Sequence, residues 1–127
     1  MKHRHLNFTD RCLTELDSAL RTLMVRPQST RQAPAGIGVD ELSNSQRELA
    51  SRLMRVNHAG EIAAQALYRG QALVARDEKL RTSLLQAANE EHDHLAWCQQ
   101  RAAKLGGGTS KLGSVWYAGS FLIGMTA

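Results

Sequence analysis

The sequence has little of what would place it in several common classes of protein. Its 127 residues include 2 cysteines, Cys12 and Cys98, too few for a disulfide scaffold or a cysteine-rich zinc site, and such usage suits a reducing compartment. Aromatic residues make up only 5% of the chain. An apolar run of about 18 residues, the minimum for a membrane-spanning helix, is missing. No apolar stretch follows the basic residues 1–5, so we expect no secretory signal peptide.

What is present fits one small domain, residues 1–127, with a modest core. Hydrophobic residues make up 43% of the chain and charged residues 22%, which argues against wholesale disorder. The net charge of +4 suits a nucleic acid and a membrane surface equally well. Because the basic residues are spread along the chain and no aromatic platform accompanies them, we expect no nucleic-acid partner.

Apolar residues at spacings of three and four predict helices along most of the chain. The first helix is expected over 9–25, with apolar positions Leu13, Leu16, Leu20, Leu23 and Met24. Residues 26–44 contain prolines and glycines and are expected to form a linker.

The longest periodic stretch predicts a second helix over 45–76, opened by a capping box of Ser45 and Glu48. Its apolar and small residues form a candidate helix–helix seam: Leu49, Leu53, Val56, Gly60, Ala63, Leu67, Gly70 and Val74. Glycine is unfavourable inside a helix, so Gly60 and Gly70 suggest close approach of a neighbouring backbone or side chain.

A polar turn over 76–79 leads to a third predicted helix, over 80–105, which three glycines at 106–108 end. Its seam is Leu84, Ala88, Glu91, Leu95, Cys98, Ala102 and Leu105. The short turn requires the second and third helices to be antiparallel. The apolar segment 115–127 predicts a fourth helix, in the bundle core or at a membrane interface. The fold class is therefore predicted to be all-α.

Glu91 is the one acidic residue in the seam of the third helix, where a bare carboxylate is costly unless it is paired, protonated or bound to metal. His94 lies one turn further on the same side, so the Glu-x-x-His pair faces the neighbouring helix. Glu61, at a similar distance from the turn, can meet them across the hairpin. Such carboxylate and imidazole groups form dinuclear metal sites in helical bundles, and Glu61, Glu91 and His94 are the candidate metal ligands.

Other interpretations of this region stay open. The charged run 90–94 could be a solvated surface stretch, and Glu91 could pair with an arginine in a purely structural helical module. Neighbouring residues have several possible roles: His92 and Asp93 as solvated or supporting the ligands, His58 as a surface or network residue, Tyr68 as a packing residue or hydrogen-bond donor, Cys98 as a small buried hydrophobe, and His3 and His5 as tail residues.

Four segments, 53–61, 65–71, 90–95 and 116–121, closely resemble the demethoxyubiquinol hydroxylase family of ubiquinone biosynthesis. The resemblance covers roughly residues 10–127. It implies a ferritin-like antiparallel helical bundle with two iron ions in a non-haem di-iron centre. It also implies an enzyme, a di-iron monooxygenase that uses O2 to hydroxylate a polyprenylated methoxy-methyl-benzoquinol.

Carried over residue by residue, the resemblance makes Glu61 a ligand of the first iron. Glu91 would bridge both irons and His94 would complete the shell of the first. The partners implied are the quinol, O2 and other ubiquinone-biosynthesis proteins. The implied location is peripheral, at the cytoplasmic face of a bacterial plasma membrane or the equivalent inner-membrane surface.

One departure from the family is clear: its second ligand set, a further Glu and Glu-x-x-His, does not occur in this sequence. We therefore expect this chain to be the N-terminal part of a longer protein, with the second ligand set outside it. The 127 residues alone would then be inactive. The alternative is that two copies of the chain pair to complete the site. The alternative function is a half-ferritin-like hairpin that dimerises and binds or oxidises iron without a quinone substrate.

Overall fold

The computed structural model describes residues 5–127, so His3 and most of the basic segment 1–5 lie outside the described residues. The elements in chain order are α1 (Phe8–Met24), the short 3₁₀ helix η1 (Val39–Glu41), α2 (Asn44–Val74), α3 (Glu78–Lys104) and α4 (Gly113–Thr126). The described part of the chain contains no strand, so the predicted all-α class is confirmed.

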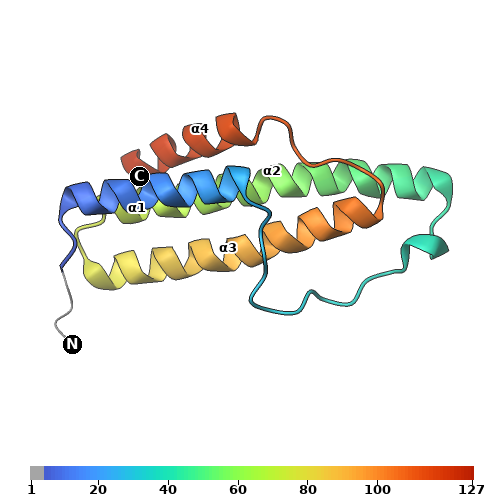
Figure 1. The fold of residues 1–127 in the computed structure, drawn as a ribbon, viewed down its shortest axis with the longest axis horizontal. Coiled ribbons are helices and arrows are strands. Elements are labelled where there is room, and N and C mark those ends of the chain that lie inside the picture. Colours follow the sequence, from blue (N-terminus) through green and yellow to red (C-terminus); the bar gives the residue numbers. More distant parts are fainter. Residues whose placement is uncertain (1–4) are drawn as a thin grey trace.

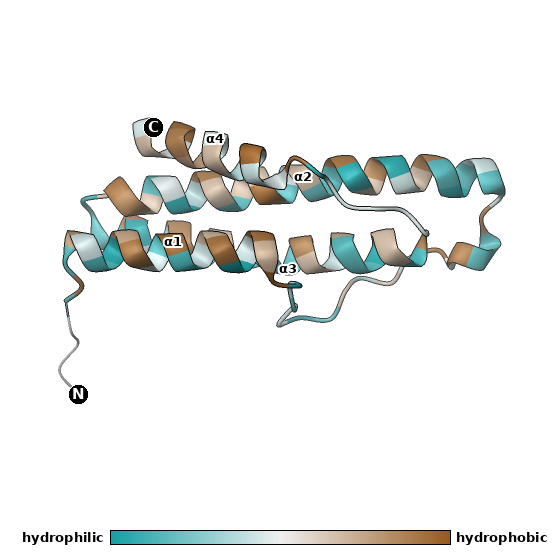
Figure 2. Cartoon of the chain, turned by 45° about the horizontal axis from the view of Figure 1, so that its top comes forward, coloured by the Kyte–Doolittle hydropathy of each residue, from teal (hydrophilic) through white to brown (hydrophobic). Residues whose placement is uncertain are grey.

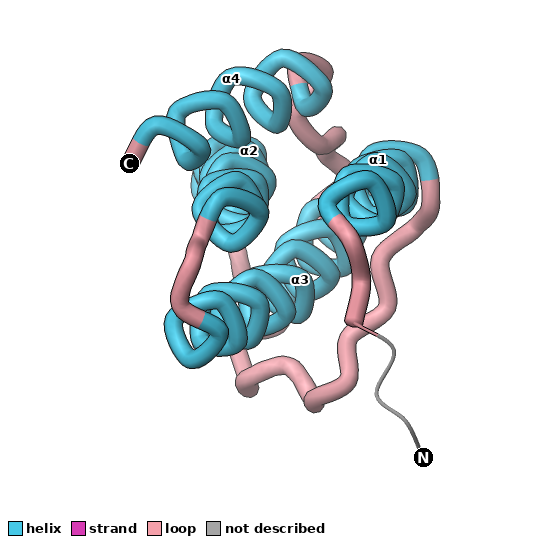
Figure 3. Tube along the Cα trace, turned by 90° about the vertical axis from the view of Figure 1, so that its left-hand side faces the viewer, coloured by secondary structure: helices cyan, strands magenta, loops and turns pink. Residues whose placement is uncertain are grey.

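The helices pack around α2, the longest of them (Figure 1). α3 returns antiparallel beside α2, and the end-on view in Figure 3 places α2 between α3 and α4, with α1 alongside. The core is small and lies where these helices meet, with Ile62, Ala66, Leu95 and Tyr117 at its centre. This arrangement brings the inner faces of α2 and α3 together along much of their length.

Local sequence explains both ends of α3. The carboxylate of Asp77 accepts a hydrogen bond from the backbone N–H of Lys79 at 3.1 Å, which caps the start of the helix. At the other end the N–H groups of Gly106 and Gly107 donate to the carbonyls of Ala103 and Ala102. Gly106 has a φ of 74°, so these bonds form the left-handed cap that a glycine permits. The predicted glycine stop is confirmed.

The predicted capping box at the start of α2 was wrong by two residues. The hydroxyl of Ser43, not Ser45, accepts from the N–H of Gln46, and the side chain of Gln46 accepts from the N–H of Ser43 at 2.9 Å. Both serines have a Glu or Gln three residues later, so the spacing alone fits either. The capping box at Ser43 starts the helix two residues earlier and so adds backbone hydrogen bonds, which explains why it forms in place of the one at Ser45.

Gly70 and Gly124 let α2 and α4 approach until their backbones touch. A Cβ on Gly70 would lie 2.2 Å from the carbonyl oxygen of Phe121, and one on Gly124 would lie 2.3 Å from that of Leu67. The expectation of close approach is confirmed at Gly70. It is wrong at Gly60, where no described neighbouring atom comes within 4 Å of the Cβ position.

The predicted seam of α2 was wrong over much of its length. Leu49, Leu53 and Val56 are 53–68% exposed, whereas Ile62, Ala66 and Leu73 are buried. Figures 1 and 3 show α1, α3 and α4 beside the C-terminal half of α2 on different sides, so the buried surface does not follow one straight stripe. The seam of α3 agrees better with the prediction, since Ala88, Leu95, Ala102 and Leu105 are buried.

α1 presents its polar side to the bundle. Its four leucines Leu13, Leu16, Leu20 and Leu23 are 37–60% exposed. Figure 2 shows hydrophobic and hydrophilic colours recurring along the whole of this helix. Glu15 and Thr22 are buried instead. Arg69 of α2 lies 3.4 Å from both carboxylate oxygens of Glu15, and Gln65 donates to Thr22 at 2.8 Å. The periodicity located the helix but not its buried side.

Candidate metal centre

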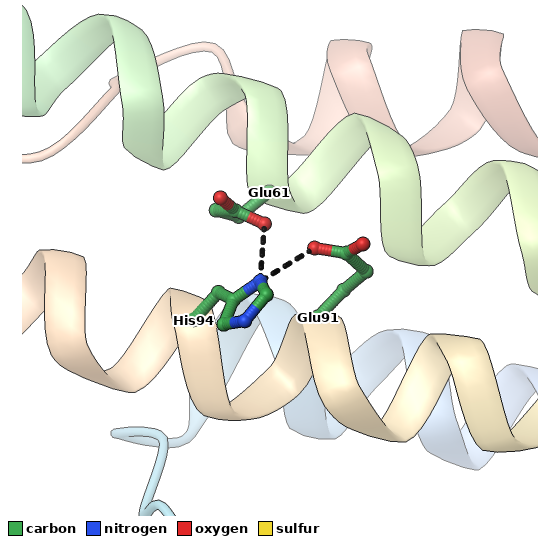
Figure 4. A group of neighbouring side chains, drawn as sticks. All are labelled: Glu61, Glu91 and His94. Carbon is green, nitrogen blue, oxygen red and sulfur yellow. Dashed lines mark hydrogen bonds and ion pairs between the residues drawn. The ribbon is translucent and has the colours of Figure 1, made fainter. Parts of the chain in front are cut away.

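The hairpin brings the three predicted ligands together. Glu61 comes from α2, and Glu91 and His94 lie one turn apart on α3 (Figure 4). The Nδ1 atom of His94 is 3.0 Å from Oε2 of Glu91 and 3.6 Å from Oε2 of Glu61. One ligand atom of each residue lies within 4.8 Å of those of the other two, and in the described residues this is the one such group of His, Cys, Asp and Glu side chains.

The three side chains are half-buried, with 20–40% of each side chain exposed. Burial, followed by the hydrogen bond and charge of Glu91, raises the pKa of Glu61 to about 7 from an ordinary value of 4.5. The hydrogen bond from Glu61 lowers the pKa of Glu91. The carboxyl pair therefore holds one proton between its two members near neutral pH.

This electrostatic arrangement fits a bound cation. Two carboxyl groups and an imidazole converge in a partly desolvated environment. When both carboxyl groups are ionised, their negative charges repel each other. A divalent cation would replace the proton shared by Glu61 and Glu91 and remove that repulsion. Oxygen and imidazole ligands suit iron, with manganese and zinc as chemically acceptable competitors. Two carboxylates and an imidazole are too few to close a site around two ions.

Other residues singled out from the sequence lie around the centre in different ways. Cys98 is half-buried, and burial together with the nearby charge of Glu61 raises the pKa of its thiol to about 11. His58 is buried rather than at the surface, and burial lowers its pKa. Tyr68 and His92 are half-buried and are not members of the group of three. His5 is exposed and precedes α1.

Asp93 has a role that the sequence did not predict. It is buried rather than solvated, and it supports a segment of the linker instead of a histidine ring. Its carboxylate accepts from the backbone N–H of Thr30 at 2.7 Å and from Nε of Arg31 at 2.8 Å. The partners are 62 and 63 residues away in a stretch without periodicity, so no local pattern indicated the contact. A clue was available in Trp97, which lies one turn after Asp93 and contacts the same segment.

The fold and the site together define the class of protein: an all-α bundle whose central antiparallel hairpin carries a candidate carboxylate–histidine metal centre. Within residues 5–127 the structure holds no helix both long and apolar enough to cross a bilayer.

Comparisons with known proteins narrow this class. The family model described as "Ubiquinone biosynthesis protein COQ7" matches residues 48–127, and the chain belongs to this family. The matched range includes all three candidate ligands.

Several curated relatives are named 3-demethoxyubiquinol 3-hydroxylase. The one from Nitrosococcus oceani is 51% identical over 129 residues, which cover 100% of this chain and 60% of that protein. The one from Variovorax paradoxus is 54% identical over 119 residues, covering 93% and 57% of the two chains. A Legionella pneumophila relative is 50% identical over 127 residues, covering 98% and 60%. The chain thus spans about 60% of the length of these relatives. No solved structure matches it.

Proposed function

We propose that the chain acts in ubiquinone biosynthesis, in the O2-dependent hydroxylation of a polyprenylated methoxy-methyl-benzoquinol at a di-iron centre. The single observation that carries this proposal is the convergence of Glu61, Glu91 and His94 within 4.8 Å, in a chain about half identical to proteins named 3-demethoxyubiquinol 3-hydroxylase. Fold and family alone would leave the chemistry unassigned, because a helical bundle serves many functions.

Each residue of the centre has a distinct part in the proposal. Glu61 on α2 would bind one iron, Glu91 on α3 would bridge two, and His94 would offer Nδ1, the nitrogen that faces both carboxylates. Bound iron would supply the reduction of O2, a reaction that side chains cannot perform by themselves. Glu61 holds a proton near neutral pH and gives it up when a cation binds.

The proposed location is the surface of the membrane that contains the quinol, on the cytoplasmic face of a bacterial plasma membrane or the equivalent inner-membrane surface. α4 supports this proposal because one side of it is apolar and exposed: Val115, Trp116, Leu122 and Ile123 are 45–64% exposed. Exposed apolar side chains of this kind, with a tryptophan among them, can insert at the lipid interface. Other proteins of the pathway are proposed partners, because a polyprenylated quinol would stay in the membrane between successive reactions.

A genetic experiment tests the proposed reaction. The full reading frame is expressed in a bacterium that lacks its own demethoxyubiquinol hydroxylase, and quinones are measured by mass spectrometry. We expect ubiquinone to be restored by the unchanged gene and lost with Glu91→Ala or His94→Ala. Glu90→Ala is the matched control, because Glu90 is an exposed neighbour outside the group of three. Persistent accumulation of the demethoxy precursor with the unchanged gene would contradict the proposed reaction.

Metal binding is tested separately on the purified chain by anaerobic titration with Fe(II). Glu91→Ala and His94→Ala should weaken binding strongly, and Glu90→Ala should not. If iron binding is the same in all four proteins, the three residues are not ligands. Iron uptake and oxidation without any restoration of ubiquinone would instead favour the half-ferritin-like function.

A further inference from the structure

The linker between α1 and η1 crosses α3 (Figure 1) and contacts Asp93, the residue before His94. Its contact point is Asp93, of which 3% is exposed. The carboxylate accepts hydrogen bonds from both the backbone N–H and the hydroxyl of Thr30, at 2.7 and 3.0 Å, and from the guanidinium of Arg31 at 2.8 Å. These contacts lower the pKa of Asp93 and attach this part of the linker firmly to α3.

The same linker segment also contacts Trp97, which lies on α3 one turn after Asp93. The indole N–H of Trp97 donates to the carbonyl oxygen of Arg31 at 3.2 Å. The guanidinium of Arg31 lies over the indole ring, 5.3 Å from its centroid, within the range of a cation–π contact. Trp97 is therefore fixed by a hydrogen bond at its edge and by a cation on its face, both from the same residue of the linker.

Trp97 in turn contacts His94. The ring centroids are 5.3 Å apart, within the distance range of interacting aromatic rings, and the planes are tilted by 44°. The side chain of His94 is 40% exposed, so the surroundings leave its ring room to rotate. In the orientation in which its ring contacts Trp97, the Nδ1 atom faces Glu61 and Glu91.

We propose that Asp93, Arg31 and Trp97 form a clamp that orients the His94 imidazole toward the two carboxylates. The three are positioning residues and do not bind the metal themselves. The proposal rests on the metal centre of the proposed function, and it adds that the linker, whose contact residues lie 62 and 63 residues before Asp93, sets the geometry of a ligand. Residues that support a metal-bound histidine commonly change metal affinity by about 10- to 100-fold when they are replaced.

The first test measures the His94 ring without metal. Ring currents from Trp97 shift the His94 ring protons, which can be followed by NMR of ¹³C-labelled histidine and assigned with His94→Gln. Arg31→Ala should move these resonances, and Trp97→Leu should move them further. Arg26→Ala, which removes an exposed arginine from the same linker, is the matched control and should leave them in place.

The second test is a titration of the same proteins with Co(II), followed through its visible absorption. We expect Arg31→Ala and Trp97→Leu to weaken affinity by about 10- to 100-fold and to change the absorption spectrum, while Arg26→Ala binds as the unchanged chain does. Thermal unfolding of each protein gives the stability for comparison.

The outcomes separate this proposal from the proposed function. If Arg31→Ala lowers the unfolding temperature but leaves the His94 resonances and the Co(II) affinity unchanged, the linker is only a structural tether and the clamp proposal is overturned. If the unchanged chain takes up no Co(II) while Arg31→Ala still moves the His94 resonances, the metal centre fails and the clamp on the ring stands.

Discussion

The raised pKa of Glu61 indicates that its surroundings are suited to binding a cation. Its carboxyl group lies where burial and the neighbouring Glu91 both oppose ionisation, so its pKa is about 7 rather than 4.5. A carboxyl group that served stability alone would be expected at a position that favours its charged form. The arrangement is unfavourable for the metal-free protein and favourable for binding a cation.

This shift predicts a pH dependence of stability. Between pH 4.5 and about 7 the folded chain holds a proton on Glu61 that the unfolded chain has released, so this residue's contribution to the free energy of unfolding falls as the pH rises. Urea unfolding of the metal-free protein across this range should show the fall relative to Glu61→Gln, which carries no charge at any pH. A parallel pH dependence of the two proteins would contradict the raised pKa. Excess divalent cation should reverse the trend, because it binds the ionised form.

At the scale of elements, the contact of α2 with α4 depends on two glycines whose Cβ positions are taken by backbone atoms of the other helix. Gly70→Ala or Gly124→Ala should therefore force the helices apart and cost about 1–3 kcal/mol or more in the free energy of unfolding. Chemical denaturation measures this cost.

Each of these glycines has a matched control in the same helix. No described neighbouring atom comes within 4 Å of the Cβ positions of Gly60 in α2 and Gly119 in α4. Alanine at these positions should stabilise the chain by about 0.5–1 kcal/mol through its better helix propensity. Equal effects at Gly70 and Gly60 would show that the close approach of α2 and α4 does not exist in solution.

The sequence predicted elements better than it predicted their faces. Helical periodicity is a local property, so the positions of all four helices followed from it, as did the hairpin that joins Glu61 to Glu91 and His94. Which side of a helix is buried depends on neighbours that periodicity does not contain. This is why the periodicity of α1 did not reveal that its leucines are exposed, and why the buried roles of His58 and Asp93 were missed. Asp93 depends on Thr30 and Arg31, which no pattern connects to it.

At the scale of the whole molecule, some polar contacts lie inside the bundle, such as Gln65 with Thr22 and Arg69 with Glu15, while much apolar surface is outside. Figure 2 shows hydrophobic colour along α1 and α4, the two helices that flank the central hairpin. Exposed apolar areas of this kind usually mark a surface that meets a lipid or another protein. The net charge of +4 would add attraction to an anionic bilayer.

A vesicle experiment tests the membrane contact proposed for α4. Trp116 is 45% exposed on the apolar side of this helix, so its fluorescence should shift to shorter wavelength when anionic vesicles are added. A Trp97→Phe background isolates the signal, because the chain has 2 tryptophans. Leu122→Glu should weaken vesicle binding at least several-fold, since it places a charge in the lipid-facing surface. Leu53→Glu on α2, where Leu53 is similarly exposed, is the control. Equal binding by the two variants would exclude α4 as the contact.

The short turn between α2 and α3 has a consequence for the order in which the molecule assembles. Closing the hairpin joins residues near each other in sequence, whereas the linker reaches Asp93 only by closing a loop of more than sixty residues. Local contacts form sooner than distant ones as a chain folds. The three candidate ligands all belong to the hairpin, so an early folding intermediate would already present them to a metal ion. In that order the linker would close onto Asp93 after the ligands have met, and the contacts that hold Trp97 beside His94 would form last.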